Sequence, residues 1–137
     1  MATAKILLIE DDPSDIYVLQ RQLKERDSDV ELQIVRDGGE ALQFVRQGLG
    51  PDPTPCVILL DLHLPKHDGL EILHAIREDP ELRHVHVIVV TNAASPQEQA
   101  ELSALGIAFR LKPCCLEEFT ALANDLIAIC HGLITPA

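Results

Sequence analysis

Side chains with carboxylate, hydroxyl or ammonium groups stand at the ends of four short apolar runs of this sequence. Three acidic residues, Glu10 to Asp12, come directly after the first of these runs, and Asp61 comes directly after the next. Thr91 ends the third of these runs and Lys112 follows the last. Two carboxylates brought to about 4 Å repel each other by roughly 4 kcal/mol at an effective dielectric constant near 20. Such a cluster predicts a bound cation, because a cation relieves the repulsion.

The oxygen-only set of candidate ligands favours a hard cation. A few carboxylates with open positions for water fit Mg²⁺ better than an all-protein Ca²⁺ cage. Taken singly, each of these residues also has an ordinary role: an acid or a threonine at a strand end commonly caps a helix, and a lysine before a proline is commonly solvated. The combination at several strand ends is therefore what predicts a site.

Short β-rich runs alternate with helical patterns along the chain. Strands are expected at residues 6–9, 30–35, 56–60, 85–90 and 107–111, and helices at residues 14–26, 39–47, 70–78, from about Ser95, and 116–130. Residues 48–55 (GLGPDPTP) are expected to form a long surface loop. This order predicts an α/β fold, with a doubly wound five-stranded parallel sheet in a flavodoxin-like (βα)5 three-layer sandwich. Ligands of such sheets bind beyond the carboxyl ends of the strands, where the candidate residues lie.

Length and charge limit the classes of function. The 137 residues, 47% of them hydrophobic, fit one domain over residues 1–137, and no output domain is expected. The 11 basic and 22 acidic side chains give a formal charge of −11, which argues against nucleic acid and against an anionic membrane surface. No apolar run has the roughly 18 to 20 residues of a spanning helix, and no signal peptide is recognisable, so a cytoplasmic location is expected.

The four cysteines are Cys56, Cys114, Cys115 and Cys130. They have no CxxC spacing and no accompanying pair of histidines, so neither a zinc site nor a disulfide framework is indicated. Structural thiols are the expected state of all four.

Four segments resemble the signature segments of response-regulator receiver domains of two-component systems. They are LLIEDDPSD, LLDLHLPKHDGLEIL, VVT and LKP, and they occur in the order of that family. The resemblance implies that Asp61 is the phosphoacceptor. It also implies an Mg²⁺ site formed by Asp61, by Asp11 directly, by Glu10 through water and by the backbone carbonyl of His63. A carboxylate nucleophile beside a cation fits phosphoryl transfer chemically.

The resemblance further implies that Thr91 and Lys112 hold phosphoryl oxygens and that Thr91 is coupled to Phe109 as a switch. Phosphorylation would draw in the Thr91 hydroxyl, let Phe109 turn inward and remodel the face made by the fourth helix, fifth strand and fifth helix. The plain alternative for Phe109 is a core aromatic. The family's Lys-Pro bond is commonly cis, so a cis bond is expected before Pro113. Asp12 is secondary, because it either supports the acidic pair or caps the next helix.

The partner implied by the resemblance is a sensor histidine kinase. The opening EDDPSD and the EDPELRHVHVIVVT stretch resemble the small regulators of bacterial phytochrome-type kinases. The last helix carries more apolar positions than one stripe requires, which indicates either a deeply docked helix or a homodimer surface through that helix and the fifth strand.

Three other classes of protein fit the pattern less well. A haloacid-dehalogenase phosphatase needs a second acid two residues after its aspartate, and His63 stands there. A flavodoxin-like electron carrier needs a phosphate-cradling loop after the first strand, where the acidic residues would repel phosphate. An interaction module that is never phosphorylated would not need the complete set of candidate residues.

Overall fold

The computed structural model describes residues 4–26, 29–47, 54–64 and 68–132. Most of the loop expected at residues 48–55 lies outside the described residues. The strands are β1 (Ala4–Ile9), β2 (Val30–Val35), β3 (Val57–Asp61), β4 (His86–Thr91) and β5 (Phe109–Leu111). The helices are α1 (Pro13–Arg26), α2 (Gly38–Gln47), α3 (Gly69–Glu78), α4 (Pro96–Ala104) and α5 (Leu116–Cys130).

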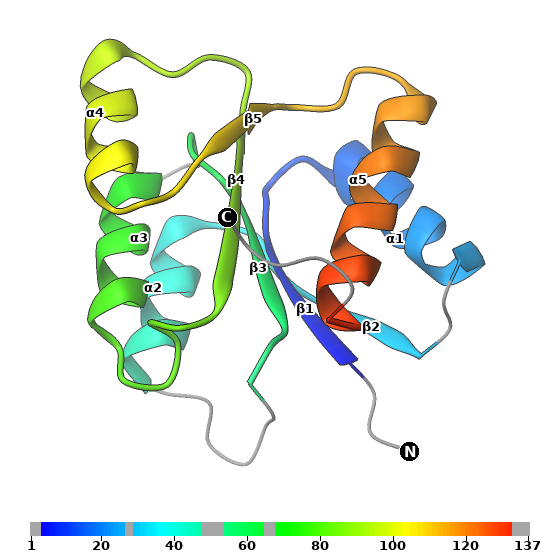
Figure 1. Ribbon diagram of the computed structural model, residues 1–137, viewed down its shortest axis with the longest axis horizontal. Coiled ribbons are helices and arrows are strands. Elements are labelled where there is room, and N and C mark those ends of the chain that lie inside the picture. Colours follow the sequence, from blue (N-terminus) through cyan, green and yellow to red (C-terminus); the bar gives the residue numbers. More distant parts are fainter. Residues whose placement is uncertain (1–3, 27–28, 48–53, 65–67, 133–137) are drawn as a thin grey trace.

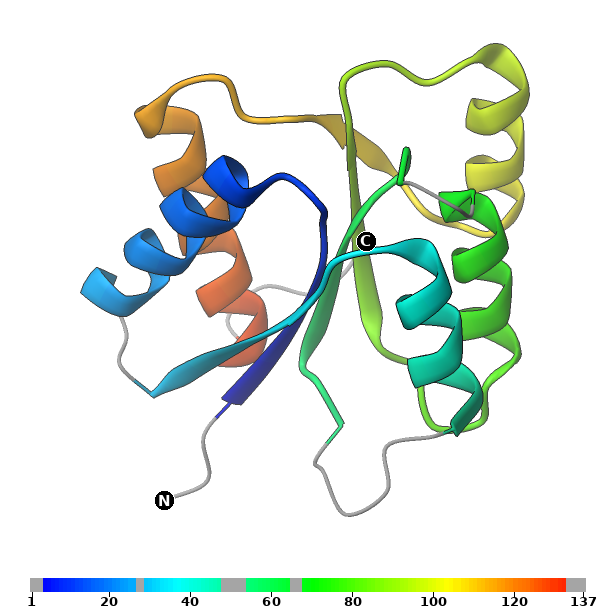
Figure 2. The same cartoon turned by 180° about the vertical axis from the view of Figure 1, so that it is seen from behind.

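The five strands form one parallel sheet in the order β2-β1-β3-β4-β5. Helices α1 and α5 cover one face, and α2, α3 and α4 cover the other (Figures 1 and 2). Alternate side chains of the central strands enter two separate apolar clusters, with Ile58 and Leu60 on the α2–α4 side and Leu59 on the α1–α5 side. The predicted fold class is therefore confirmed. No helix of the described residues has the length and apolarity needed to cross a membrane.

The strand β3 is buried along its whole length, and its end is packed closely on α3. The first helical residue, Gly69, donates its backbone N–H to the carbonyl oxygen of Leu62 at 3.0 Å. A Cβ atom at Gly69 would lie 2.8 Å from the Cα atom of Leu62, which is closer than packed atoms tolerate. A glycine is therefore required where α3 begins beside the residue that follows Asp61.

The strand β5 is two residues shorter than predicted, because the end of α4 uses the residues before it. Gly106 has a φ angle of 71°, in the left-handed region that glycine adopts easily. Its N–H donates to the carbonyl of Ser103 at 3.0 Å. The N–H of Ile107 donates to the carbonyl of Leu102 at 2.9 Å, which completes a Schellman cap. Ile107 thus closes the helix and does not start the strand.

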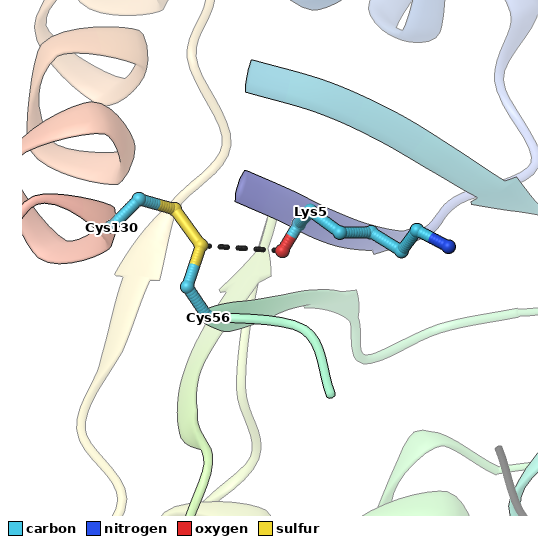
Figure 3. The surroundings of a disulfide bond; sticks show 3 residues. All are labelled: Lys5, Cys56 and Cys130. Carbon is cyan, nitrogen blue, oxygen red and sulfur yellow. Dashed lines mark hydrogen bonds between the residues drawn. A yellow bond between two sulfur atoms is a disulfide. The ribbon is translucent and has the colours of Figure 1, made fainter. Parts of the chain in front are cut away.

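The prediction of four free thiols is wrong for two of the cysteines. Cys56, directly before β3, and Cys130, the last residue of α5, form a disulfide with a Cα–Cα distance of 5.2 Å (Figure 3). Cys114 and Cys115 are free and exposed. The two bonded cysteines are 74 residues apart in sequence. Local spacing contains no information on such a pair, since only the packing of α5 on the sheet brings the two residues together.

Candidate functional site

The candidate residues gather at one edge of the sheet, where the parallel strands β1, β3 and β4 end. Asp61 is the last residue of β3 and pairs in register with Val90 of β4. Glu10 directly follows β1, and its N–H donates to the carbonyl of Val35 at the end of β2. The cavity there has a volume of about 420 Å³. It is lined by Asp11, Asp12, Pro13, Asp61, His63, Asn92 and Lys112.

The ammonium group of Lys112 lies between two buried carboxylates. Its Nζ atom donates to Oε1 of Glu10 at 2.9 Å and lies 2.9 Å from Oδ2 of Asp61. The exposed fractions of the two acidic side chains are 4% and 5%, so water screens this ion triad only weakly. Lys112 comes from the segment after β5, more than a hundred residues after Glu10. The sheet topology therefore brings together three residues that the sequence could only place at separate strand ends.

Burial raises the pKa of Glu10 in the acidic cluster. Burial, with the nearby charge of Asp61 as a further cause, raises the pKa of Glu10 from 4.5 to about 7, against the hydrogen bond from Lys112. Burial opposes the charge on Lys112, but hydrogen bonds to Glu10 and Asp61 outweigh it and raise the lysine pKa. Lys112 is therefore cationic, and the site tends to hold an additional proton near neutral pH.

Three carboxylates are arranged as ligands for one cation. Single oxygen atoms of Glu10, Asp11 and Asp61 all lie within 4.8 Å of one another. Glu10 and Asp61 are buried, whereas Asp11 is exposed in the cavity. Oxygen atoms alone, open to solvent on one side, match the ligand preference of a hard divalent cation that keeps several water molecules. The residues present therefore fit a divalent metal.

Thr91 is fully buried and is turned toward its own loop. Its hydroxyl donates to the carbonyl of Ala93 at 2.8 Å, and its Oγ1 atom lies 3.3 Å from Nδ1 of His63. The other ring nitrogen of His63, Nε2, lies 3.0 Å from Oε2 of Glu98 in the first turn of α4. The imidazole thus connects the buried threonine to a neighbouring helix. Sequence spacing does not reveal this connection, because Glu98 lies 35 residues after His63.

Asp12 makes the hydrogen bonds of a helix cap and also lines the cavity. Its Oδ1 atom accepts hydrogen bonds from the N–H groups of Ser14 at 2.8 Å and Asp15 at 3.4 Å. Asp12 therefore caps the start of α1. Asp15 itself was not identified from the sequence as a site residue, yet its Oδ2 atom lies 3.6 Å from Nζ of Lys112. Burial and the charge of Asp12 raise the pKa of Asp15, consistent with its place at the edge of the acidic cluster.

The expectation of a cis bond before Pro113 is wrong, because the Lys112–Pro113 bond is trans. The side chain of Lys112 reaches both Glu10 and Asp61 with this geometry, so a cis bond is not needed to direct it inward. Phe109 pairs in register with Val89 and is half-buried against the α2–α4 cluster. The side chain of Phe109, the residue expected to act as a switch, is thus neither fully buried nor fully exposed.

Comparison with known proteins identifies the class that this fold and site define. The profile of the response regulator receiver domain matches residues 6–124. The chain belongs to this family, and it is therefore a receiver domain of a two-component response regulator. Accepting a phosphoryl group is the general function of such domains.

The similar proteins include a cyanobacterial phytochrome response regulator. The response regulator Rcp1 of Synechocystis sp. is 43% identical over 90 residues, which cover 64% of this chain and 61% of the relative. The matched part is thus less than two thirds of that relative's length. The structure of the phosphorylated cyanobacterial phytochrome response regulator RcpA has a TM-score of 0.84 and 31% identity, with 98% of each chain covered. The Mn²⁺-bound structure of Rcp1 has a TM-score of 0.81 and 31% identity, and covers 98% of this chain and 99% of that chain.

Proposed function

We propose that Asp61 accepts a phosphoryl group from a sensor histidine kinase. The observation that carries this proposal is the ion triad of Glu10, Asp61 and Lys112 at the carboxyl end of the sheet. It brings a carboxylate that can act as nucleophile beside a cation that can balance an incoming anion. Oδ1 of Asp61 accepts the N–H of His63 at 3.1 Å, and Oδ2 meets Lys112, so both oxygens are oriented.

In the proposed reaction, an oxygen of Asp61 attacks the phosphorus atom and the kinase histidine leaves. Lys112 stays within the site and stabilises negative charge on the phosphoryl oxygens. The Thr91 hydroxyl would exchange its hydrogen bond to Ala93 for one to a phosphoryl oxygen. Phe109 would then turn inward into the space that the Thr91 hydroxyl vacates. This movement would change the shape of the face made by α4, β5 and α5.

We further propose Mg²⁺ as the cation of the acidic cluster. Glu10, Asp11 and Asp61 would hold it, with the backbone carbonyl of His63 as an additional ligand. When bound, the ion neutralises charge between the acceptor and the phosphoryl oxygens. This role fits the proximity of the three carboxylates, which brings several negative charges around one small volume.

Mg²⁺ is expected to raise the melting temperature of the wild-type chain by about 5 °C at ten times its dissociation constant. Asp11→Ala should remove this rise, because Asp11 is exposed in the cavity and contributes a ligand oxygen without supporting the core. Thermal unfolding at matched ionic strength measures the effect. Asp125→Ala, on the exposed side of α5, is the control and should respond like the wild type. An equal rise in the Asp11 variant would reject the ligand set.

The cellular setting is proposed from the relatives. Because the similar RcpA structure is that of a phytochrome response regulator, we propose a phytochrome-type kinase as donor, in the cytoplasm. Leu111 of β5 and Leu116 of α5 have exposed fractions of 67% and 61%. Two large exposed apolar side chains, one on each of these elements, support a homodimer contact through the fifth strand and last helix.

The experiment that tests the function is phosphoryl labelling of the intact chain. Incubation with a small phosphodonor such as acetyl phosphate and Mg²⁺ should add one phosphoryl group, measured by intact-mass spectrometry. Excess chelator should prevent the addition. Absence of labelling, both from the small donor and from a histidine kinase of the phytochrome type, would contradict the proposed function.

A further inference from the structure

The disulfide lies at the other end of β3 from Asp61. Cys56 directly precedes β3, and Cys130 ends α5, so the bond joins the sheet to the last turn of the helix (Figure 3). Both residues are half-buried at the edge of the α1–α5 cluster. This position leaves the pair accessible to small reagents while the surrounding packing holds it in place.

Each cysteine is positioned by contacts that do not depend on the bond. The N–H of Cys56 donates to the carbonyl oxygen of Lys5 in β1 at 2.8 Å. Cys130 follows the buried residues Leu122, Ala123 and Leu126, which fix α5 on the sheet. The Cα–Cα distance of 5.2 Å is within the usual range for a disulfide. The two sulfur atoms would therefore remain neighbours after reduction, and the bond could close again.

The surroundings also accommodate the reduced state. The Sγ atom of Cys56 lies 3.2 Å from the Lys5 carbonyl oxygen (Figure 3). A sulfur in a disulfide has no hydrogen to donate, but the thiol of reduced Cys56 could donate to this oxygen. Reduction would thus leave no buried donor without an acceptor at this residue. Such tolerance of both states distinguishes a reversible pair from a bond that the fold requires.

Cys114 and Cys115 are poorly placed to form a disulfide with Cys56 or Cys130. Cys115 precedes the 15 residues of α5, so it lies about 22 Å along the helix axis from Cys130. The hydrogen bond to Glu118, together with the charge of that carboxylate, raises the pKa of the Cys114 thiol. A raised pKa reduces the thiolate fraction that takes part in disulfide exchange. Exchange is therefore expected to be selective for Cys56 and Cys130.

We propose that Cys56 and Cys130 form a reversible thiol–disulfide pair, a redox-modification site that reacts with small disulfides and thiols of the glutathione class, and that its closure holds the C-terminal end of α5 on the sheet. In closure, the thiolate of one cysteine attacks a small disulfide and releases one small thiol. The second cysteine then attacks the mixed disulfide at the protein sulfur and releases the other. Two protein thiols are oxidised, and one small disulfide is reduced to two thiols.

The holding effect follows from how the two ends of α5 are fixed. At its start, the cap residue Cys115 makes no side-chain capping hydrogen bond, and Leu116 is largely exposed. At its end, the disulfide ties the helix to β3 across 74 residues of chain. Closure of a loop of that length restricts the unfolded chain strongly. The site is independent of phosphorylation at Asp61, so the test of one does not decide the other.

The first test is a redox titration of the folded, full chain. The protein is equilibrated with mixtures of reduced and oxidised glutathione, quenched with acid and alkylated, and each cysteine is then scored by peptide mass spectrometry. Cys56 and Cys130 should switch together and reversibly, while Cys114 and Cys115 stay alkylatable. The proposal is overturned if the pair stays closed in every mixture, stays open in every mixture, or is replaced by a bond between Cys114 and Cys115.

The second test measures the consequence for α5. Oxidation should raise the melting temperature by on the order of 10 °C in the wild type and in Cys114→Ser/Cys115→Ser, but not in Cys56→Ser or Cys130→Ser. The amides of His131 and Gly132, which donate to carbonyls of the last turn, should exchange at least about ten-fold more slowly in the oxidised wild type. Equal exchange in the oxidised and reduced protein would overturn the holding effect, and this comparison needs no variant.

Discussion

Replacing Asp61 with asparagine is expected to abolish phosphoryl incorporation, a loss of at least about 100-fold relative to the wild type. Asparagine keeps the size of the side chain, but its amide is not a nucleophile toward phosphorus. The amide oxygen can still accept the N–H of His63, which donates to Oδ1 of Asp61 at 3.1 Å. Removal of one buried negative charge also relieves Glu10, whose pKa is raised by burial and by the charge of Asp61. The variant should therefore fold, and only its chemistry should be lost.

Intact-mass spectrometry after incubation with acetyl phosphate and Mg²⁺ measures this loss. The matched control is Asp125→Asn, since the side chain of Asp125 on α5 has an exposed fraction of 44% and pairs with Arg110 at 2.9 Å. The control should be labelled like the wild type, because an exposed ion pair contributes little to stability. Labelling of the Asp61 variant at the wild-type level would place the acceptor elsewhere in the acidic cluster.

Lys112→Ala is expected to lower the free energy of unfolding of the metal-free protein by about 3 kcal/mol. The lysine ammonium is the cation that lies between Glu10 and Asp61, each at 2.9 Å. Without it, two carboxylates with exposed fractions of 4% and 5% would face each other in a poorly screened site. Mg²⁺ should therefore stabilise this variant more than it stabilises the wild type, because the ion would replace the missing charge.

The loss of unfolding free energy caused by Lys112→Ala should also depend on pH. The folded-state pKa of Glu10 is raised from 4.5 to about 7, so the folded protein holds a proton that the unfolded chain releases, and stability falls as pH rises through this window. The raised pKa of Lys112 leaves its contribution fully present below 10.5. The difference between wild type and Lys112→Ala should consequently be larger at about pH 8 than at about pH 6, where Glu10 can take up a proton.

Denaturant unfolding in chelating buffer at both pH values provides this comparison. Lys24→Ala is the matched control, because Lys24 is exposed in the last turn of α1. Its effect should lie within about 0.5 kcal/mol of zero. Equal effects of the two lysine substitutions would show that the ion triad does not stabilise the site.

The sequence predicted the fold, and the meeting of Glu10 and Asp61 at one edge of the sheet, because both depend on short-range patterns. The apolar runs before Glu10 and Asp61 predict strands that are covered on both faces, and parallel strands place their carboxyl ends at one edge. Lys112 could be placed at that edge for the same reason. Its two short contacts, to Glu10 and Asp61, require the actual packing of β5 and α5 and were not predictable.

The features that were missed or wrongly predicted depend on contacts over long separations or on competition for backbone hydrogen bonds. The bond between Cys56 and Cys130 spans 74 residues. Ile107 is apolar and β-branched, which favours a strand, but its N–H is used by the cap of α4. The contact of His63 with Glu98 depends on where α4 begins relative to the loop after Asp61. A pattern confined to one segment of the sequence cannot predict any of these contacts.

The His63 ring links the first turn of α4 to Thr91, because Nε2 contacts Glu98 and Nδ1 contacts the Thr91 hydroxyl. The start of α4 can therefore respond to a movement of Thr91. The two carboxylate oxygens of Glu98 have different partners. Oε1 accepts the N–H of Ser95 at 2.8 Å, and Oε2 lies 3.0 Å from Nε2 of His63. If the Thr91 hydroxyl leaves the loop, Nδ1 of His63 loses a neighbour and the ring gains freedom to rotate. The residue at which α4 begins would then differ between the two states of Thr91. The same sequence could present α4 with either a fixed or a frayed first turn to whatever protein binds there.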